Sequence, residues 1–261
     1  MNGIIGARDI LWVTLDTLRF DVADRAMAEG RTPNFAKLLP NGWERRHTPG
    51  SFTLSAHAAF FAGFLPTPAG PGPHPRLFAS RFEGSETTAP QTWVHDAAHV
   101  PGGLADAGYH TACIGGVGFF NKRTELGRVF PGMFHESHWE PRFGVTDPDS
   151  TRHQVGKACE IIGALDGTQR LFLFLNVSAL HQPNCIFADG AHEDSPATME
   201  TALSYVDAQL PPLLDALRER GPAFCIFMSD HGTCYGEDGY TGHRLAHPAV
   251  WEVPYGEAVL D

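Results

Sequence analysis

The sequence predicts an α/β fold, built on a doubly wound, mostly parallel sheet with helices on both faces. Two observations lead to this prediction. Short, almost continuous apolar runs alternate with helical patterns, and polar residues follow several of the apolar runs directly. At 261 residues the chain is long enough to bury one large core, so a single domain over residues 1–261 is expected.

Four apolar segments are predicted to be buried parallel strands. Each is short and is bounded by polar or turn-forming residues, which is the pattern of a strand covered on both faces. The segments are residues 10–15, 110–114, 171–177 and 223–228. In a sheet of this kind ligands bind beyond the carboxyl ends of the strands, so the residues that follow each segment are the first candidates for a site.

Helical patterns fill the intervals between these strands. They cover residues 32–39, 54–64, 151–165 and 198–220. Thr32 is expected at the N-cap of the first helix, with Pro33 at its first helical position. Two stretches, near 64–92 and 115–150, are expected to be irregular excursions from the domain, because the first is rich in Pro, Gly, Ser and Thr and the second shows no clear periodicity.

The charge of the chain limits its partners. A formal net charge of -11 argues against nucleic acid, but allows a small anionic ester as substrate if a bound metal neutralises it. The first twenty residues hold no apolar run long enough for a signal peptide, so the sequence predicts a cytoplasmic protein without a membrane partner. Five cysteines without Cys-x-x-Cys spacing predict neither a disulfide framework nor a cysteine zinc site. The oligomeric state is left open.

Carboxylates at two strand ends indicate a metal site. Asp16 closes the first predicted strand, and Asp230 and His231 follow the last. If those strands are neighbours, two carboxylates and an imidazole meet at one edge of the sheet. Mixed oxygen and nitrogen ligands suit zinc or manganese better than calcium. The alternative is that each Asp only caps the following helix or turn.

A hydroxyl nucleophile is predicted at the start of the second helix. Thr53 and Ser55 lie where a loop enters a helix of small residues. A helix N-terminus offers N–H groups to an anion, and a metal-activated hydroxyl there can attack phosphorus. The alternative is that either hydroxyl is simply an N-cap.

Further polar residues are candidates for the same site. Asn176, at the end of the third strand, is expected to bind substrate, and His181 just after it is expected to act in catalysis. His243 is a candidate metal ligand. Lys122 and Arg123, from the aromatic-rich excursion, are expected to help bind the substrate.

Several sequence blocks occur in an order typical of one family. They are Asp16-Thr17-Leu18-Arg19, Thr32-Pro33-Asn34, Thr53-Leu54-Ser55-Ala56-His57 with Gly63 and Pro66, Ala107-Gly108-Tyr109-His110-Thr111, and Ser229-Asp230-His231-Gly232 with Gly242-His243. In this order, and over nearly the whole chain, they resemble the sulfatase branch of the alkaline phosphatase superfamily.

The resemblance implies a fold and a set of roles. It implies an alkaline-phosphatase-like α/β core, a metal held by Asp16, Asp230 and His231, and a nucleophile at Thr53 that also contacts the metal. His181 matches a substrate-contacting histidine of sulfatase-like relatives. His243 matches a histidine that binds the second ion in two-metal members.

Departures from the sulfatase pattern narrow the expected chemistry. Sulfatases make a formylglycine nucleophile from Cys or Ser within Cys/Ser-x-Pro-x-Arg, whereas Thr53, Ser55 and His57 occupy those positions here. Threonine cannot form that aldehyde, so the sequence is more similar to the phosphodiesterase, phosphomutase and phosphoglycerol-transferase branches. Two-metal members carry Asp-x-x-x-His after a middle strand, but Val177 stands four residues before His181. One ion is therefore favoured, and a second is left open.

These inferences predict a metal-dependent hydrolase or transferase of phosphate-type esters that uses Thr53 as nucleophile. Two alternatives stay open. One is a sulfoesterase or phosphonate hydrolase in which Thr53 is only a ligand and water attacks. The other is a noncatalytic binding partner of a modifying enzyme.

Overall fold

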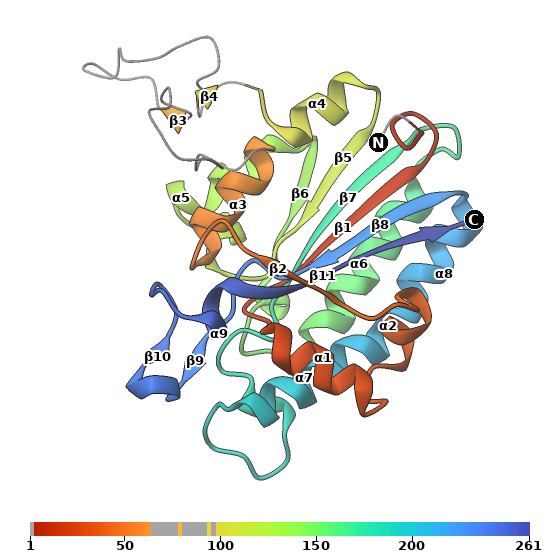
Figure 1. The fold of residues 1–261 in the computed structure, drawn as a ribbon. Coiled ribbons are helices and arrows are strands. Elements are labelled where there is room, and N and C mark those ends of the chain that lie inside the picture. The colour runs from red at the N-terminus through yellow and green to blue at the C-terminus, as the bar shows by residue number, and fades with distance from the viewer. Residues whose placement is uncertain (1–2, 64–77, 80–92, 95–97) are drawn as a thin grey trace.

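The computed structural model describes residues 3–63, 78–79, 93–94 and 98–261, and its centre is a seven-stranded sheet (Figure 1). The strand order is β2-β11-β8-β1-β7-β5-β6. The strands are β1 (Asp9–Leu15), β2 (Glu44–His47), β5 (His110–Ile114), β6 (Glu136–His138), β7 (Leu171–Val177), β8 (Ala223–Met228) and β11 (Glu252–Leu260). β8, β1, β7, β5 and β6 are parallel to one another, whereas β11 is antiparallel to β8 and to β2. The predicted doubly wound, mostly parallel sheet is confirmed.

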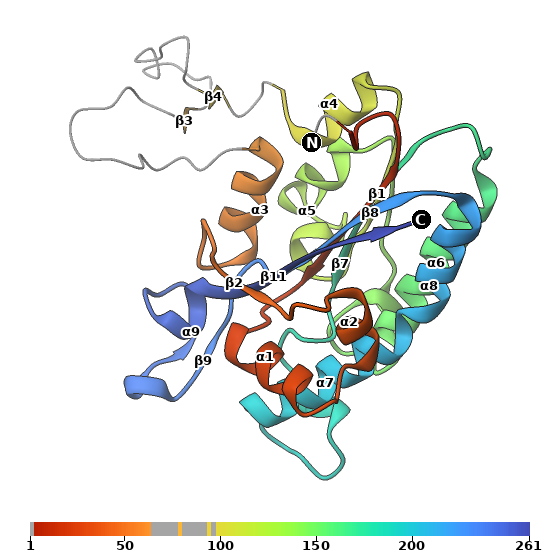
Figure 2. The same cartoon turned by 45° about the vertical axis from the view of Figure 1, so that its right-hand side comes forward.

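Helices cover both faces of this sheet (Figure 2). One face carries α1 (Phe20–Ala28), α2 (Pro33–Leu38), α6 (Ser150–Ala164), α7 (Pro196–Gln209) and α8 (Pro211–Arg220). The other face carries α3 (Thr53–Ala62), α4 (Val100–Asp106) and α5 (Glu125–Val129). A short helix, α9 (Pro248–Trp251), precedes β11, and two small ribbons pair β9 (Cys234–Tyr235) with β10 (Thr241–Gly242) and β3 (Phe78–Ala79) with β4 (Trp93–Val94).

Strand β7 contributes side chains to the hydrophobic cores on both faces of the sheet. Its leucines and Val177 belong to the larger core under α6, α7 and α8, while Phe172 and Phe174 belong to the aromatic core under α3 and α4. Side chains alternate between the faces of a strand, so the sequence Leu-Phe-Leu-Phe-Leu fills one core with leucine and the other with phenylalanine. Both cores are needed to hold the carboxyl end of β7 in place.

Two helices differ in detail from the sequence-based expectation. The helix predicted over 198–220 is two helices, α7 and α8, because Pro211 and Pro212 lack the N–H that would continue α7. Thr32 does occupy the N-cap of α2, but the cap bonds run to the carboxylate of Asp207, which accepts from the N–H groups of Asn34 at 3.1 Å and Phe35 at 2.7 Å.

The two predicted excursions have different outcomes. Most of 64–92 lies outside the described residues. The stretch near 115–150 is not wholly irregular, since it contains α5, β6 and three short 3₁₀ turns. Within the described residues, no helix is both long enough and apolar enough to cross a membrane.

Candidate metal centre

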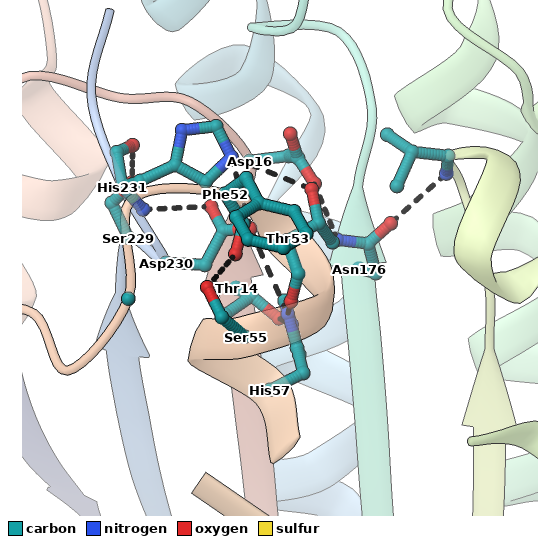
Figure 3. A network of polar contacts seen from close by, with 12 residues as sticks. Thr14, Asp16, Phe52, Thr53, Ser55, His57, Asn176, Ser229, Asp230 and His231 are labelled. Atoms are coloured by element: carbon teal, nitrogen blue, oxygen red, sulfur yellow. Dashed lines mark hydrogen bonds and ion pairs between the residues drawn. The ribbon is translucent and has the colours of Figure 1, made fainter. Parts of the chain in front are cut away.

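The carboxyl ends of β1 and β8 bring three potential metal ligands together. The two strands pair in parallel, with Thr14 beside Met228, so the residues that follow them share one edge of the sheet. Asp16, Asp230 and His231 each offer one ligand atom, and these atoms lie within 4.8 Å of one another. All three side chains are fully buried (Figure 3).

The pKa values of the two carboxyl groups are shifted in opposite directions. Burial and the nearby charge of Asp16 raise the pKa of Asp230 well above its usual value, although backbone N–H groups partly oppose this. For Asp16, burial alone would raise the pKa, but electrostatic interactions with the imidazoles of His181 and His231, together with the hydrogen bond from Asn176, outweigh it and the net shift is downward. Two carboxylates in one buried volume repel each other, and a divalent cation between them would remove that penalty.

One carboxylate oxygen of Asp230 has no hydrogen-bond partner among the described residues. Its Oδ1 accepts hydrogen bonds from the N–H groups of Thr17 at 3.1 Å and His231 at 3.0 Å. Its Oδ2 is buried and accepts no hydrogen bond from any described residue. An unsatisfied buried carboxylate oxygen is costly, so this atom fits a ligand better than a structural acceptor.

His231 is oriented to offer a lone pair to the same point. Its Nδ1–H donates to the carbonyl of Gly232 at 2.9 Å, which leaves Nε2 unprotonated and 3.5 Å from Oδ2 of Asp230. Burial lowers the pKa of His231, so the imidazole is neutral and able to bind a metal. Gly232 is required because a β-carbon there would lie only 2.0 Å from the carbonyl oxygen of Ala249.

Thr17 joins the two carboxylates from a strained backbone. Its φ of 70° is in the left-handed region, which is unfavourable for a β-branched residue. From there its N–H reaches Asp230, and its hydroxyl donates to Oδ1 of Asp16 at 2.9 Å. The sequence predicted Asp16-Thr17 as a block, but not this role for Thr17.

Thr53 faces the three ligands from the other side. It is the first residue of α3, and it is only 3% exposed. Its Oγ1 lies 3.5 Å from Oδ2 of Asp16 and 3.4 Å from Nε2 of His231. By contrast, the hydroxyl of Ser55 donates to the carbonyl of Phe52 at 3.0 Å within the same helical turn. Of these two hydroxyls, therefore, Thr53 is the one at the candidate metal centre.

His57 bonds the backbone of Thr53. Its Nδ1–H donates to the carbonyl of Thr53 at 2.8 Å, and its Nε2 lies 3.2 Å from the hydroxyl of Thr14 on β1. Burial lowers the pKa of His57 to about 4, so it is a neutral donor and acceptor. The imidazole thus ties the first turn of α3 to the strand that carries Asp16.

Asn176 positions Asp16. Its Nδ2 donates to Oδ2 of Asp16 at 3.1 Å, and its Oδ1 accepts from the N–H groups of Gly116 and Val117. The side chain is fully buried and is bonded within the protein on both sides. Its predicted contact with substrate stays a prediction, whereas its contact with Asp16 is direct.

Asn176→Ser is expected to lower zinc affinity by roughly 10- to 100-fold, because a serine cannot reach Asp16 from the same position. Equilibrium competition with a zinc-binding dye would measure this. Asn34→Ala is the matched control, since Asn34 also bonds a buried carboxylate, that of Asp207, at 3.0 Å but on α2. Equal zinc affinity of the wild type and Asn176→Ser would contradict the positioning role.

A cavity of about 300 Å³ opens beside Thr53. One side is formed by the 117–127 segment, and the other by His181, His243 and Arg244. The rings of His231 and His243 are 4.5 Å apart between centroids. Nδ1 of His243 is buried without a hydrogen-bond partner in the described residues, and burial, followed by the electrostatic interaction with the neighbouring imidazole of His231, lowers the pKa of His243 to about 4. Its predicted metal ligation stays a prediction.

Two residues expected to bind substrate have other partners. The ammonium of Lys122 donates to the carbonyl of Ser137 at 2.8 Å, and the guanidinium of Arg123 lies 4.5 Å from the ring centre of Trp139. Neither belongs to the lining that the described residues give the cavity. The cation that does line it is Arg244, which sequence reasoning missed, although it directly follows the Gly242-His243 block.

Comparisons with known proteins identify the fold. No family model and no curated protein matches the chain. Among solved structures, it is similar to the periplasmic domain of a phosphoethanolamine transferase from Campylobacter jejuni (14% identity, 97% of this chain and 80% of that one, TM-score 0.65). It is also similar to the periplasmic domain of EptC from Escherichia coli in complex with zinc (12%, 97% and 73%, 0.63).

A third similar structure is a protein in the alkaline phosphatase superfamily from Vibrio parahaemolyticus (18% identity, TM-score 0.63). The match covers 97% of this chain but only 60% of that one. At these identities the likeness establishes the fold, so the resemblance to the alkaline phosphatase superfamily is confirmed at that level. The predicted cytoplasmic location is contradicted, because matching structures are described as periplasmic domains. The lack of a long apolar run in the first twenty residues is therefore not a sufficient criterion for a cytoplasmic location.

Proposed function

We propose that this chain, which has the fold of the alkaline phosphatase superfamily, uses a divalent metal ion to hydrolyse or transfer a small anionic phosphate-type ester. The observation that carries the proposal is the buried Oδ2 of Asp230, which has no hydrogen-bond partner in the described chain and faces Nε2 of His231. The hydroxyl of Thr53 lies within 3.5 Å of both His231 and Asp16. This arrangement supports one ion held by Asp16, Asp230, His231 and Thr53.

The donor set supports zinc or manganese. Two carboxylates, one imidazole and one hydroxyl are the mixed oxygen and nitrogen ligands that these ions accept. When bound, the ion supplies positive charge that lowers the pKa of a coordinated hydroxyl and polarises the phosphoryl group. A second ion near His181 and His243 is not required by the proposal.

Thr53 acts as the nucleophile in the proposed reaction. Its Oγ1 attacks phosphorus, the bond from phosphorus to the first alcohol breaks, and that alcohol leaves with the proton that Thr53 gave up. Water or an acceptor alcohol then attacks phosphorus, takes the phosphoryl group and returns a proton to Thr53. The two outcomes, hydrolysis and transfer, differ only in the second acceptor.

Two features of the chain stabilise negative charge during this reaction. The N-terminus of α3 presents backbone N–H groups beside Thr53, and its N-cap residue, Phe52, has no side chain able to bond them. His181 also lines the cavity, and its Nδ1 bonds the carbonyl oxygen of Gln182 at 2.7 Å. It would donate to a phosphoryl oxygen from Nε2 when both of its ring nitrogens carry a proton.

The alternatives explain the geometry less well. In a sulfoesterase or phosphonate hydrolase that uses water, Thr53 would be a ligand only, and its place at the start of α3 would have no catalytic purpose. A noncatalytic binding partner would keep two buried, mutually repelling carboxylates at a cost in stability without a compensating use.

Removing the metal tests the proposal. Protein dialysed against a chelator is expected to lose turnover of an aryl phosphodiester by about two orders of magnitude or more, and to regain it with one equivalent of zinc or manganese. An aryl sulfate measured in parallel is expected to react more slowly. Turnover that is unchanged after metal content falls to zero by elemental mass spectrometry would refute metal dependence.

A further inference from the structure

The cavity beside Thr53 has a size suited to a small group. Its volume of about 300 Å³ is at the lower end for ligand sites. Thr53 and residues of the 117–127 segment both line the cavity. An ester bound with phosphorus at Thr53 would therefore place a short substituent of the phosphoryl group in this cavity.

The described residues that line the cavity include a positively charged side chain and no negatively charged one. Among the described residues that form the cavity wall there is no Asp or Glu, and the hydrogen-bonding groups are those of Thr53, Asn121, Thr124, His181, His243 and Arg244. Arg244 is the member with a permanent positive charge. Asp16 and Asp230 are not part of this wall and belong to the candidate metal centre.

Arg244 is held in place by three features. Its backbone adopts φ of 71°, a left-handed conformation that is uncommon for a residue other than glycine. Its N–H donates to the carbonyl of Ser51 at 2.9 Å, which ties it to the loop before α3. Its guanidinium lies 5.3 Å from the ring centre of Phe52, the residue that precedes Thr53.

The guanidinium has no carboxylate partner in the part of the chain that the structure describes. Arg19, by comparison, pairs with Asp21 and Glu237. A strained backbone that holds an unpaired cation beside a cavity is typical of a ligand clamp.

We infer that the cavity selects phosphate esters in which the group retained on phosphorus carries a second negative charge, such as a carboxylate, and that Arg244 binds this charge. The inference rests on the proposed function for the position of the phosphoryl group. It goes beyond it by naming the substrate class. A cationic substituent such as ethanolamine would meet Arg244 without a carboxylate to pair with, so this chain disfavours it.

Binding of three simple phosphate monoesters to the zinc-loaded protein tests the inference. The ligands are 2-carboxyethyl phosphate, propyl phosphate and 2-aminoethyl phosphate, which differ mainly in the charge of one end. Isothermal titration calorimetry is expected to give the wild type roughly tenfold tighter binding of the carboxyethyl ester than of the propyl ester, with the aminoethyl ester weakest.

In Arg244→Gln the preference for the carboxyethyl ester is expected to disappear, while propyl phosphate binds within about twofold of the wild type. Arg46→Gln is the matched control, since Arg46, on the edge strand β2, is also exposed and lies 5.2 Å from the ring centre of Tyr255. Equal weakening of all three ligands in Arg244→Gln would overturn the inference, because Arg244 would then bind the phosphoryl oxygens. Tightest binding of the aminoethyl ester by the wild type would also overturn it.

The inference and the proposed function can fail separately. The substrate-class inference stands and the catalytic proposal falls under one outcome. In it, the charge preference and its loss in Arg244→Gln are observed, but the wild type cleaves no aryl phosphodiester made from any of the three phosphate monoesters. If the aryl esters are cleaved with no dependence on charge, the catalytic proposal stands and the inference falls.

Discussion

Asp230→Asn is expected to abolish zinc binding and turnover while making the metal-free protein more stable than the metal-free wild type. The substitution keeps the shape of the side chain and its Oδ1, which accepts from Thr17 and His231. It replaces the unpartnered Oδ2 with an amide nitrogen, 3.5 Å from the unprotonated Nε2 of His231. An amide N–H can donate to that nitrogen, whereas a carboxylate oxygen cannot.

The expected gain in stability follows from the raised pKa of Asp230. A carboxyl group whose pKa is higher in the folded state than in the unfolded state binds its proton more tightly when folded. The metal-free protein is therefore destabilised as pH rises from the ordinary range of a carboxyl pKa through the raised pKa of Asp230. Asparagine has no proton to lose, so the difference between variant and wild type should be present at neutral pH and shrink as pH falls.

Urea unfolding in the presence of a chelator, at neutral and at acidic pH, measures this difference, and zinc titration measures affinity, which is expected to fall roughly 100-fold or more. Asp215→Asn serves as the control because its carboxylate is 65% exposed and its one ion pair among the described residues is with Arg218 on α8. A metal-free Asp230→Asn protein that is less stable than the wild type would mean that Asp230 is a structural residue.

The sequence was sufficient to predict the main sheet and the residues that meet at the candidate metal centre, because both follow from local patterns. The run over 171–177 is apolar on both faces, so it can only be a covered strand, and Asp16 and Asp230 directly follow two such runs. Strand β11, which lies between β2 and β8, was not predicted because Pro254 and exposed residues such as Glu257 interrupt the apolar pattern. Its place beside β8 is set by long-range pairing that no local signal shows.

The residues that the sequence could not assign act through backbone conformation or distant contacts. Thr17 and Arg244 both have positive φ, and neither residue type favours that conformation, so composition gives no sign of it. His57 was noted only as a departure from the sulfatase pattern. Its role depends on Thr14, which lies 43 residues earlier in the chain.

Thr53→Ala is expected to lower kcat for an aryl phosphodiester by roughly a thousandfold or more, whereas Thr53→Ser should retain activity within about tenfold. Alanine removes the hydroxyl that lies 3.4 Å from Nε2 of His231, and serine restores it without the methyl group. Zinc affinity should fall much less than in Asp230→Asn, because Asp16, Asp230 and His231 all remain. Loss of turnover with metal retained would place Thr53 in the chemical step.

A covalent intermediate separates this role from that of a simple metal ligand. Rapid acid quenching followed by peptide mass spectrometry is expected to find the phosphoryl group on Thr53 in the wild type, and on no residue in Thr53→Ala. Ser55→Ala is the matched control, because its hydroxyl belongs to the same helical turn but bonds the carbonyl of Phe52 and points away from Asp16. If Thr53→Ala turned over as fast as the wild type, water would be the nucleophile. In that case the position of Thr53 at the start of α3 would reflect only the binding of the ion.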